Sequence, residues 1–304
     1  STASRVYPLG EETAHLIGYV QAISADELKT KEGKGYSSSS IIGKAGLEQA
    51  YEDTLRGIDG TEIYIIDENG TRLKTLAKQD KKDGTDVKLT IDSNIQKQLY
   101  YQMKSDKGFF VVMNPTTGEL LATVSTPSYN SNDFVLGLSQ SQWDELNNDE
   151  SKPLYNRFLQ SYCPGSTFKP LTAVAGLMDG AITENDTVND VGLWSSEYTG
   201  SQVLENFQKI GHGVTDVRKA LEVSSNYFFY ETAIRLYVKN GANIDALNSI
   251  ARYAWKFGLG VEQGKTASTG IQIYENFGQT YNFVSWRKSL SENAKYTIVP
   301  ALEA

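Results

Sequence analysis

The spacing of apolar residues predicts strands in the first part of the chain and helices in its middle. Residues 61–76 alternate between apolar and polar side chains around an Asn-Gly pair, which favours a tight hairpin turn. Residues 109–114 and 119–125 flank a Pro-Thr-Thr-Gly turn, and we expect this second hairpin to lie in a central sheet. The short apolar run over residues 14–20 is a further strand candidate.

Helical spacing dominates the middle of the chain. A helix is expected over residues 94–104, with Asp92 or Ser93 as its N-terminal cap. Apolar side chains recur at helical spacing over residues 167–178, 217–220, 226–238 and 245–256. Strands early in the chain and helices later predict an α+β fold, an antiparallel sheet with helices.

A charged stretch over residues 78–84 is typical of a linker and indicates two sections. We expect residues 1–86 to form a smaller β-rich section and residues 87–304 to form the larger domain. The chain starts at Ser1 rather than at a methionine, so we expect a fragment of a longer protein. The sequence contains neither a signal peptide nor an apolar run long enough for a membrane span.

Composition excludes several classes of protein. A hydrophobic content of 39% is that of a globular chain, and a net charge of −8 without a basic cluster argues against nucleic-acid binding. Cys163 is alone, which excludes an intrachain disulfide and a cysteine-rich metal site. No second cysteine or histidine accompanies Cys163, so we interpret it as a partly buried, inert thiol. Nothing in the sequence indicates a metal or an organic cofactor.

Ser166 and Lys169 are the candidate nucleophile and base. Three residues separate them, so a helix places both on one face, one turn apart. The chain has only two histidines, His15 and His212, and neither is near a plausible nucleophile in sequence, which disfavours a Ser-His-Asp triad. A Pro-Gly pair before Ser166 favours a turn that starts a helix, and Pro170 is expected to distort the first turn of that helix.

A bare Ser-x-x-Lys pattern is weak, because Ser285 and Lys288 also match it. That second pair has polar and charged neighbours and no preceding turn, so we interpret it as a surface segment. His212 lies between two glycines, and we interpret it as a structural histidine in a loop.

Ser224, Ser225 and Asn226 form a second candidate motif directly before the helix predicted over residues 226–238. Taken alone, Ser225 or Asn226 is equally explained as a helix cap.

Taken together, these motifs resemble those of the penicillin-binding proteins, the transpeptidases of bacterial wall synthesis. The segment Pro164–Pro170 is similar to their nucleophile motif and Ser224-Ser225-Asn226 to their second motif. Residues 89–92, 114–119 and 125–129 resemble the start of a class B transpeptidase domain. Residues 7–10, 15–20 and 43–48 resemble the non-catalytic, pedestal-like or dimerisation section before it, in particular that of low-affinity, resistance-type proteins of Gram-positive bacteria.

The resemblance implies roles for the candidate residues. Ser166 would attack the carbonyl between the terminal D-alanines of a stem peptide, neutral Lys169 would accept its proton, Ser224 would relay a proton, and Asn226 would hold a substrate amide and contact Lys169. Penicillins and other β-lactams would trap the acyl-enzyme. Bringing the pKa of a lysine from about 10.4 to about 7 requires roughly 4–5 kcal/mol.

The resemblance also implies partners and a location. Peptidoglycan stem peptides, β-lactam antibiotics and other proteins of cell-wall synthesis are expected partners. The extracytoplasmic face of the cell membrane is the expected location, with an anchor before residue 1.

The family's third motif, Lys-Thr-Gly on a strand beside the nucleophile, does not occur in the sequence, and Lys265-Thr266-Ala267 is only superficially similar. We therefore expect the last strands to be missing and these 304 residues alone to acylate poorly. Two alternatives stay open: a non-catalytic wall-binding or scaffolding module that keeps the fold, and a serine β-lactamase.

Overall fold

The computed structural model describes residues 4–262, 264–266, 268, 273, 275–282, 284–285 and 287–289. The chain divides into two compact units, one comprising Ser1–Gln160 and Gly270–Glu275, the other Ser161–Thr269 and Asn276–Ala304. The predicted sections 1–86 and 87–304 stay a prediction. Within the described residues, no helix is both long enough and apolar enough to cross a bilayer.

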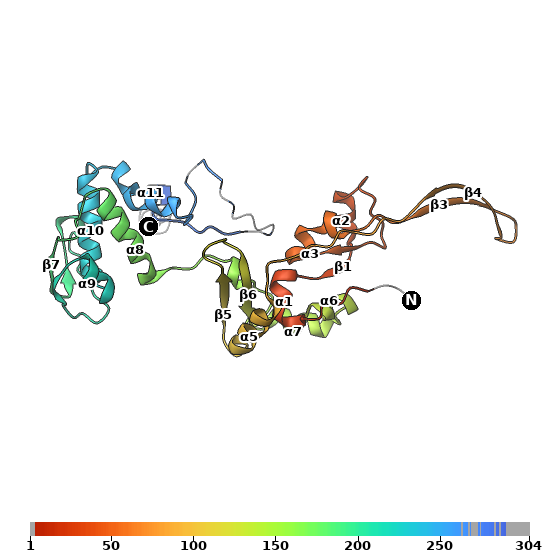
Figure 1. The fold of residues 1–304 in the computed structure, drawn as a ribbon, viewed down its shortest axis with the longest axis horizontal. Helices are drawn as coiled ribbons and strands as arrows, with labels where there is room; N and C mark the ends of the chain where they lie inside the picture. Colours follow the sequence, from red (N-terminus) through yellow and green to blue (C-terminus); the bar gives the residue numbers. More distant parts are fainter. Residues whose placement is uncertain are drawn as a thin grey trace, which may run out of the picture. The chain divides into compact units, whose positions relative to one another are not determined.

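The first unit combines short helices with three antiparallel strand pairs, β1–β2, β3–β4 and β5–β6 (Figure 1). Its elements in order are α1 (Gly10–Ile17), β1 (Val20–Ala22), α2 (Ala25–Thr30), β2 (Ile41–Gly43), α3 (Gly46–Ala50), α4 (Glu52–Leu55), β3 (Thr61–Ile66), β4 (Arg72–Gln79), α5 (Ser93–Met103), β5 (Gly108–Met113), β6 (Leu120–Thr126), α6 (Ser131–Leu136), α7 (Gln140–Asn148) and the 3₁₀ turn η1 (Arg157–Leu159).

Both predicted hairpins are present. β3 pairs with β4 from Thr61 opposite Gln79, and β5 pairs with β6 from Gly108 opposite Thr126. The predicted place of β5 and β6 in a central sheet is wrong for the described residues, where the two strands pair only with each other. Most side chains of β5 are accordingly exposed, whereas β6 is buried against the helices.

The predicted strand over residues 14–20 is wrong, because most of this run belongs to helix α1. Glu11 and Glu12 lie in the first turn of α1, where carboxylates favour the helix N-terminus. Gly18, with φ of +80°, ends the helix in a conformation that favours glycine. A short apolar run fits a buried helix as well as a strand, so its pattern alone could not decide.

Gln96 connects α5, β6 and α1 from a fully buried position. Its Nε2 donates to the carbonyl oxygens of Glu12 (2.6 Å) and Thr123 (2.7 Å), and its Oε1 accepts from the Thr123 N–H (2.8 Å). Because these bonds satisfy the buried amide, Gln96 stabilises the packing of the three elements. The predicted cap of α5 is confirmed, since the Asp92 carboxylate accepts from the backbone N–H of Asn94 and Ile95.

Acid is expected to destabilise this unit through His15. His15 is 7% exposed, its Nε2 lies 3.3 Å from the Pro127 carbonyl oxygen, and burial lowers its pKa from 6.5 to about 4. Between these two pH values the unfolded chain binds a proton that the folded chain does not. The free energy of unfolding therefore falls as the pH is lowered from about 6.5 to about 4, by about 3 kcal/mol in all.

Urea unfolding gives the free energy of unfolding of the wild type and of His15→Gln between pH 7 and pH 4. The contribution of His15 is the difference between the two proteins in how steeply this free energy changes with pH. The glutamine variant is expected to lose less stability over that range. Equal losses in the two proteins would contradict the assignment to His15.

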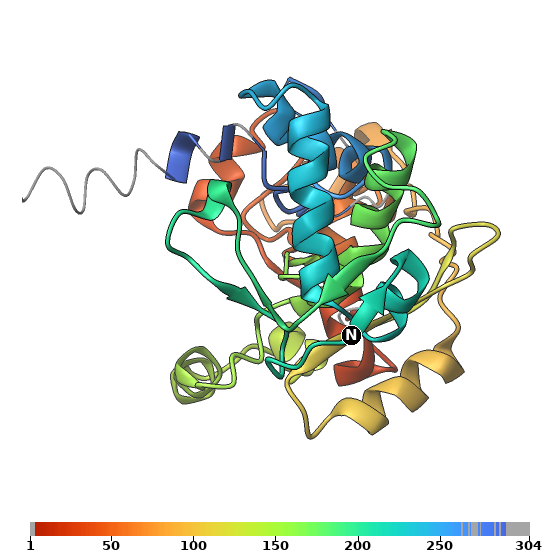
Figure 2. The same cartoon turned by 90° about the vertical axis from the view of Figure 1, so that its left-hand side faces the viewer.

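The second unit is mainly helical (Figure 2). Its elements are η2 (Gly165–Phe168), α8 (Lys169–Met178), β7 (Val188–Asp190), β8 (Leu193–Trp194), η3 (Glu197–Thr199), β9 (Leu204–Glu205), β10 (Gly213–Thr215), α9 (Val217–Glu222), α10 (Asn226–Lys239), η4 (Asp245–Asn248) and α11 (Ser249–Lys256). The predicted helices over residues 217–220 and 226–238 are confirmed as α9 and α10. The predicted helix over 245–256 begins as the 3₁₀ turn η4.

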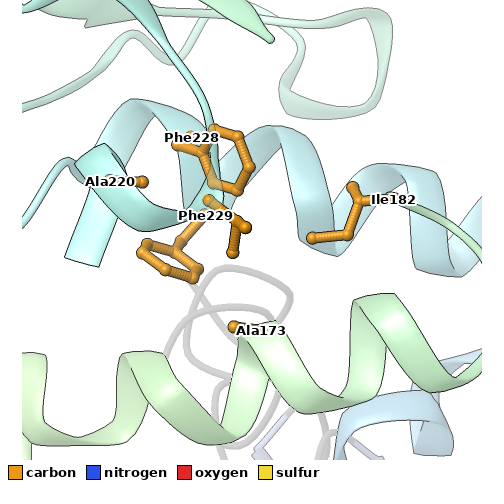
Figure 3. Close-up of a cluster of buried hydrophobic side chains, with 6 residues drawn as sticks. Ala173, Ile182, Ala220, Phe228 and Phe229 are labelled. Carbon is orange, nitrogen blue, oxygen red and sulfur yellow. The ribbon is translucent and has the colours of Figure 1, made fainter. Parts of the chain in front are cut away.

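α8 and α10 lie side by side over an apolar core. Gly176 permits this contact, since a Cβ there would lie 2.8 Å from Cγ2 of Thr232 on α10. Figure 3 shows the buried cluster that joins α8, α9 and α10, which consists of Ala173, Ile182, Val217, Ala220, Phe228 and Phe229. The cluster fixes the start of α10 relative to α8, where the two candidate motifs lie. Helices and antiparallel strand pairs in both units confirm the predicted α+β class.

Candidate active site

The candidate nucleophile lies on an irregular turn at the start of α8. Ser166 belongs to the 3₁₀ turn η2 and is exposed, and Lys169 is the first residue of α8. Pro170 follows in the first helical turn, where its missing N–H leaves no hydrogen bond unmade. The distorted turn predicted around Pro170 is thus present as η2.

Lys169 connects the two candidate motifs. Its Nζ donates to the Oγ of Ser224 (2.9 Å) and to the backbone carbonyl oxygen of Ser224 (2.6 Å), 55 residues further along the chain. The turn that carries Ser166 and the segment between α9 and α10 therefore meet at one amine.

Partial burial of Lys169 shifts its protonation equilibrium towards the neutral amine. The side chain is partly buried, and its Nζ lies 5.9 Å from the ring centre of Phe229, a core residue. Burial lowers the pKa of Lys169 below the ordinary lysine value of 10.5, because a charged amine loses solvation there. This is the direction that a lysine needs to act as a base.

Ser224 has an unusual backbone conformation. Its φ is +55°, in the left-handed region, just after α9 ends at Glu222 and Val223. Glycine is the usual residue at such a helix end, and a residue with a Cβ costs about 1–2 kcal/mol more there. Strain of this kind at a serine that binds Lys169 supports a functional role for the side chain.

Asn226 is the first residue of α10 and faces a different neighbour from the one expected. Its Nδ2 donates to the Glu205 carbonyl oxygen (3.0 Å) and its backbone N–H donates to the Oδ1 of Asn206 (2.8 Å). The expected contact with Lys169 is not among the hydrogen bonds of the described residues.

The Ser166 hydroxyl makes no hydrogen bond to a described residue. The structure therefore brings Lys169 and Ser224 together. Ser166, one turn before Lys169, is left exposed. Bonds between nucleophile and base are often long without substrate and shorten when it binds. The roles of Ser166, Lys169, Ser224 and Asn226 stay predictions.

Two residues near this site were not predicted from the sequence. Asp190 and Asn206 are buried, 1% and 2% exposed, behind the segment that carries Ser224 and Asn226. Each is a single polar residue in a short irregular region, and no motif surrounds it. His212, interpreted as structural, lies with its Nδ1 2.7 Å from the Asp190 carboxylate.

The second Ser-x-x-Lys pair has a local role. The Ser285 hydroxyl donates to the Asn282 carbonyl oxygen (2.9 Å) and accepts from the Asn282 N–H (2.8 Å), while Lys288 is exposed. Of the Lys-Thr-Ala segment, Lys265 and Thr266 belong to no strand, and Lys265 is paired with Glu262. Ala267 lies outside the described residues. Cys163, expected to be partly buried, is exposed.

Sequence comparison decides the family. Residues 1–89 match the penicillin-binding protein dimerisation domain, and residues 108–297 match the penicillin-binding protein transpeptidase domain. The chain belongs to the class B penicillin-binding proteins. The resemblance predicted from the motifs is therefore confirmed.

Individual members of the family are similar over most of this chain. Penicillin-binding protein 3 of Bacillus subtilis is 41% identical over 77% of the chain and 35% of its own length. The peptidoglycan D,D-transpeptidase MrdA of Escherichia coli is 36% identical over 93% of the chain and 43% of its own length. The chain thus spans less than half the length of these relatives.

Solved structures show the same fold. PBP2 of Helicobacter pylori, in its complex with MreC, superposes with a TM-score of 0.74 and 30% sequence identity, over 86% of this chain and 46% of that one. This likeness confirms the predicted penicillin-binding, transpeptidase-like fold.

Proposed function

We propose that this protein is a peptidoglycan D,D-transpeptidase that acts through an acyl-enzyme on Ser166. The observation that carries the proposal is the pair of hydrogen bonds from Lys169 to Ser224, in a member of this family. Lys169 itself lies one helical turn after the exposed Ser166. A serine nucleophile needs an adjacent base, and Lys169 is the residue one turn away from it.

The first half of the reaction forms the acyl-enzyme. Neutral Lys169 accepts the Ser166 proton while Oγ attacks the carbonyl carbon between the two terminal D-alanines. The carbon–nitrogen bond of that peptide breaks, and the nitrogen of the departing D-alanine takes a proton through the Ser224 hydroxyl. The hydrogen bond between Lys169 and Ser224 provides the path for that proton.

The second half transfers the acyl group. The amine of a neighbouring stem peptide attacks the ester carbon, a new peptide bond forms and the ester bond to the Ser166 oxygen breaks. The proton that the attacking nitrogen loses returns to the Ser166 oxygen. Asn226 is suited to orient the substrate, since an amide side chain at the start of α10 can both donate to and accept from a peptide. A β-lactam is attacked in the same way and remains on Ser166, because no amine displaces it.

Electrostatics decides whether the first step occurs near neutral pH. A charged Lys169 has no lone pair with which to accept the serine proton. Burial lowers the pKa of Lys169, and a bound substrate that excludes water adds to this effect.

The partners and the location of the protein belong to the same proposal. We expect it to bind stem peptides and β-lactams, and to work beside other wall-synthesis proteins at the extracytoplasmic face of the membrane. The Helicobacter pylori relative forms a complex with MreC, which supports MreC or a protein similar to it as a partner.

A product assay tests the proposal. The full-length gene product is incubated with a stem pentapeptide and an acceptor amine, and released D-alanine and joined peptides are measured. We expect both products from the wild type and neither from Ser166→Ala, with Ser285→Ala as the matched control that keeps activity.

The same assay separates the alternatives. Rapid loss of the penicilloyl group to water, without joined peptides, would indicate a serine β-lactamase. Binding of peptidoglycan by wild type and Ser166→Ala alike, without either product, would indicate a non-catalytic wall-binding module.

A further inference from the structure

A buried carboxylate organises the segment that carries Ser224 and Asn226. Asp190, at the end of β7, is 1% exposed. It accepts hydrogen bonds from the backbone N–H of Gly192 (2.8 Å), the Nδ2 of Asn206 (2.9 Å), the Nδ1 of His212 (2.7 Å) and the Oγ of Ser225 (2.6 Å). Four donors around one buried carboxylate compensate the cost of its burial.

Asn206 connects Asp190 to the start of α10 through hydrogen bonds. Its Nδ2 is held by the Asp190 carboxylate and by the Ile210 carbonyl oxygen (2.9 Å). That arrangement turns its Oδ1 towards α10, where it accepts from the backbone N–H of Asn226 (2.8 Å) and Tyr227 (3.1 Å). Both N–H groups belong to the first helical turn and have no partner within the helix.

Ser225 provides a second connection. It is fully buried between the two candidate catalytic residues of the motif, donates to Asp190 and accepts from the backbone N–H of Phe228 (3.1 Å). Because Ser225 is fixed from both sides, the residues before and after it are fixed as well. Ser224, with its left-handed backbone and its hydrogen bond from Lys169, lies directly before this fixed residue.

Asp190 is ionised in this setting. Burial by itself raises its pKa, whereas the hydrogen bonds from Ser225, His212 and Asn206 lower it, and the result is a pKa below the ordinary aspartate value. An ionised carboxylate can accept hydrogen bonds from all four donors. A neutral carboxyl group carries a proton, which would lie against these donors in place of an acceptor.

We propose that Asp190 and Asn206 are positioning residues of the acylation site, which hold Ser224 and Asn226 in place through Ser225 and the first turn of α10. This inference rests on the proposed function for its effect on rate. Neither residue touches the reacting atoms. Their effect is geometric, and a displacement of about 1 Å in a catalytic group lowers rates by as much as about 100-fold.

Asp190→Asn tests the proposal in the full-length gene product. The substitution keeps the size of the side chain and replaces one acceptor oxygen by a donor amide. We expect the rate constant of acylation by a fluorescent penicillin to fall by about 10–100-fold. Asn206→Asp should give a similar loss, because it keeps an acceptor for α10 but removes the donor that faces Asp190.

Asp179→Asn is the matched control. Asp179 follows the far end of α8 and accepts from Tyr253, Asn240 and Arg252, so it is also a hydrogen-bonded carboxylate of this unit. A purely structural loss lowers the amount of protein that is labelled but leaves the rate constant of the folded fraction unchanged. We expect that behaviour from Asp179→Asn and a lowered rate constant from the other two variants.

Amide hydrogen exchange provides a readout that does not depend on activity. Exchange at Asn226 and Tyr227 should accelerate in Asp190→Asn and not in Asp179→Asn. Wild-type rate constants and unchanged exchange in Asp190→Asn and Asn206→Asp would overturn the inference. If the wild type is not labelled, the proposed function has failed, and the exchange at these two amides decides the positioning role by itself.

Discussion

Lys169→Met is expected to lower the rate of acylation by penicillin by a factor of about 10²–10⁴, the range found for loss of a general base. Methionine keeps most of the length and packing of the side chain but has no amine. The variant therefore cannot accept the Ser166 proton, and the hydrogen bonds to Ser224 are lost as well. Stopped-flow labelling of the full-length gene product with a fluorescent penicillin measures the rate.

Lys169→Arg and Lys288→Met complete this experiment. Arginine keeps a positive charge near Ser224 but does not lose its proton, so it should be about as slow as methionine. Lys288→Met changes the second Ser-x-x-Lys pair and should react like the wild type. The wild-type rate should rise with pH, with a midpoint below the ordinary lysine pKa of 10.5, because burial lowers the pKa of Lys169. A wild-type rate for either Lys169 variant would refute the role of Lys169 as base.

Ser224→Gly is expected to give a more stable protein than Ser224→Ala, and both variants are expected to acylate much more slowly than the wild type. Both variants lose the hydroxyl that binds Lys169, so both should acylate about 100-fold more slowly or worse. Only glycine fits the φ of +55° without strain. After correction for the greater freedom of glycine in the unfolded chain, the glycine variant should exceed the alanine variant in free energy of unfolding by about 1 kcal/mol.

Urea unfolding and penicillin labelling of the same two preparations check both parts. Equal stabilities would show that the left-handed conformation carries no strain. Rapid labelling of either variant would show that acylation does not use the Ser224 hydroxyl.

Local signals account for what the sequence predicted of the fold. The hairpins β3–β4 and β5–β6 are set by turn residues and alternation within about twenty residues, and α5 is set by its Asp92 cap. Residues 14–20 were mispredicted because the deciding contacts are distant. Ala14 packs in a buried cluster with Tyr129 and Phe134, more than a hundred residues later. Tertiary packing of this kind overrides a short apolar pattern.

The residues of the candidate site also divide into those with a local signal in the sequence and those without one. Ser166, Lys169, Ser224 and Asn226 lie in compact motifs with recognisable neighbours. The structure joins the two motifs through the contact between Lys169 and Ser224. Asp190 and Asn206 could not be found in this way. They are separated by 16 positions and act on residues 225–227 only through the folded chain. Burial of a charged group with four donors is a property of the structure and leaves no pattern in the sequence.

The position of the acyl group on the chain tests the central claim most directly. The full-length gene product is incubated with a penicillin, digested, and mapped by mass spectrometry for the added penicilloyl mass. Our account predicts a single stoichiometric adduct on the Oγ of Ser166. An adduct on Cys163, Ser224 or Ser285 instead, or no adduct on a folded protein, would contradict it.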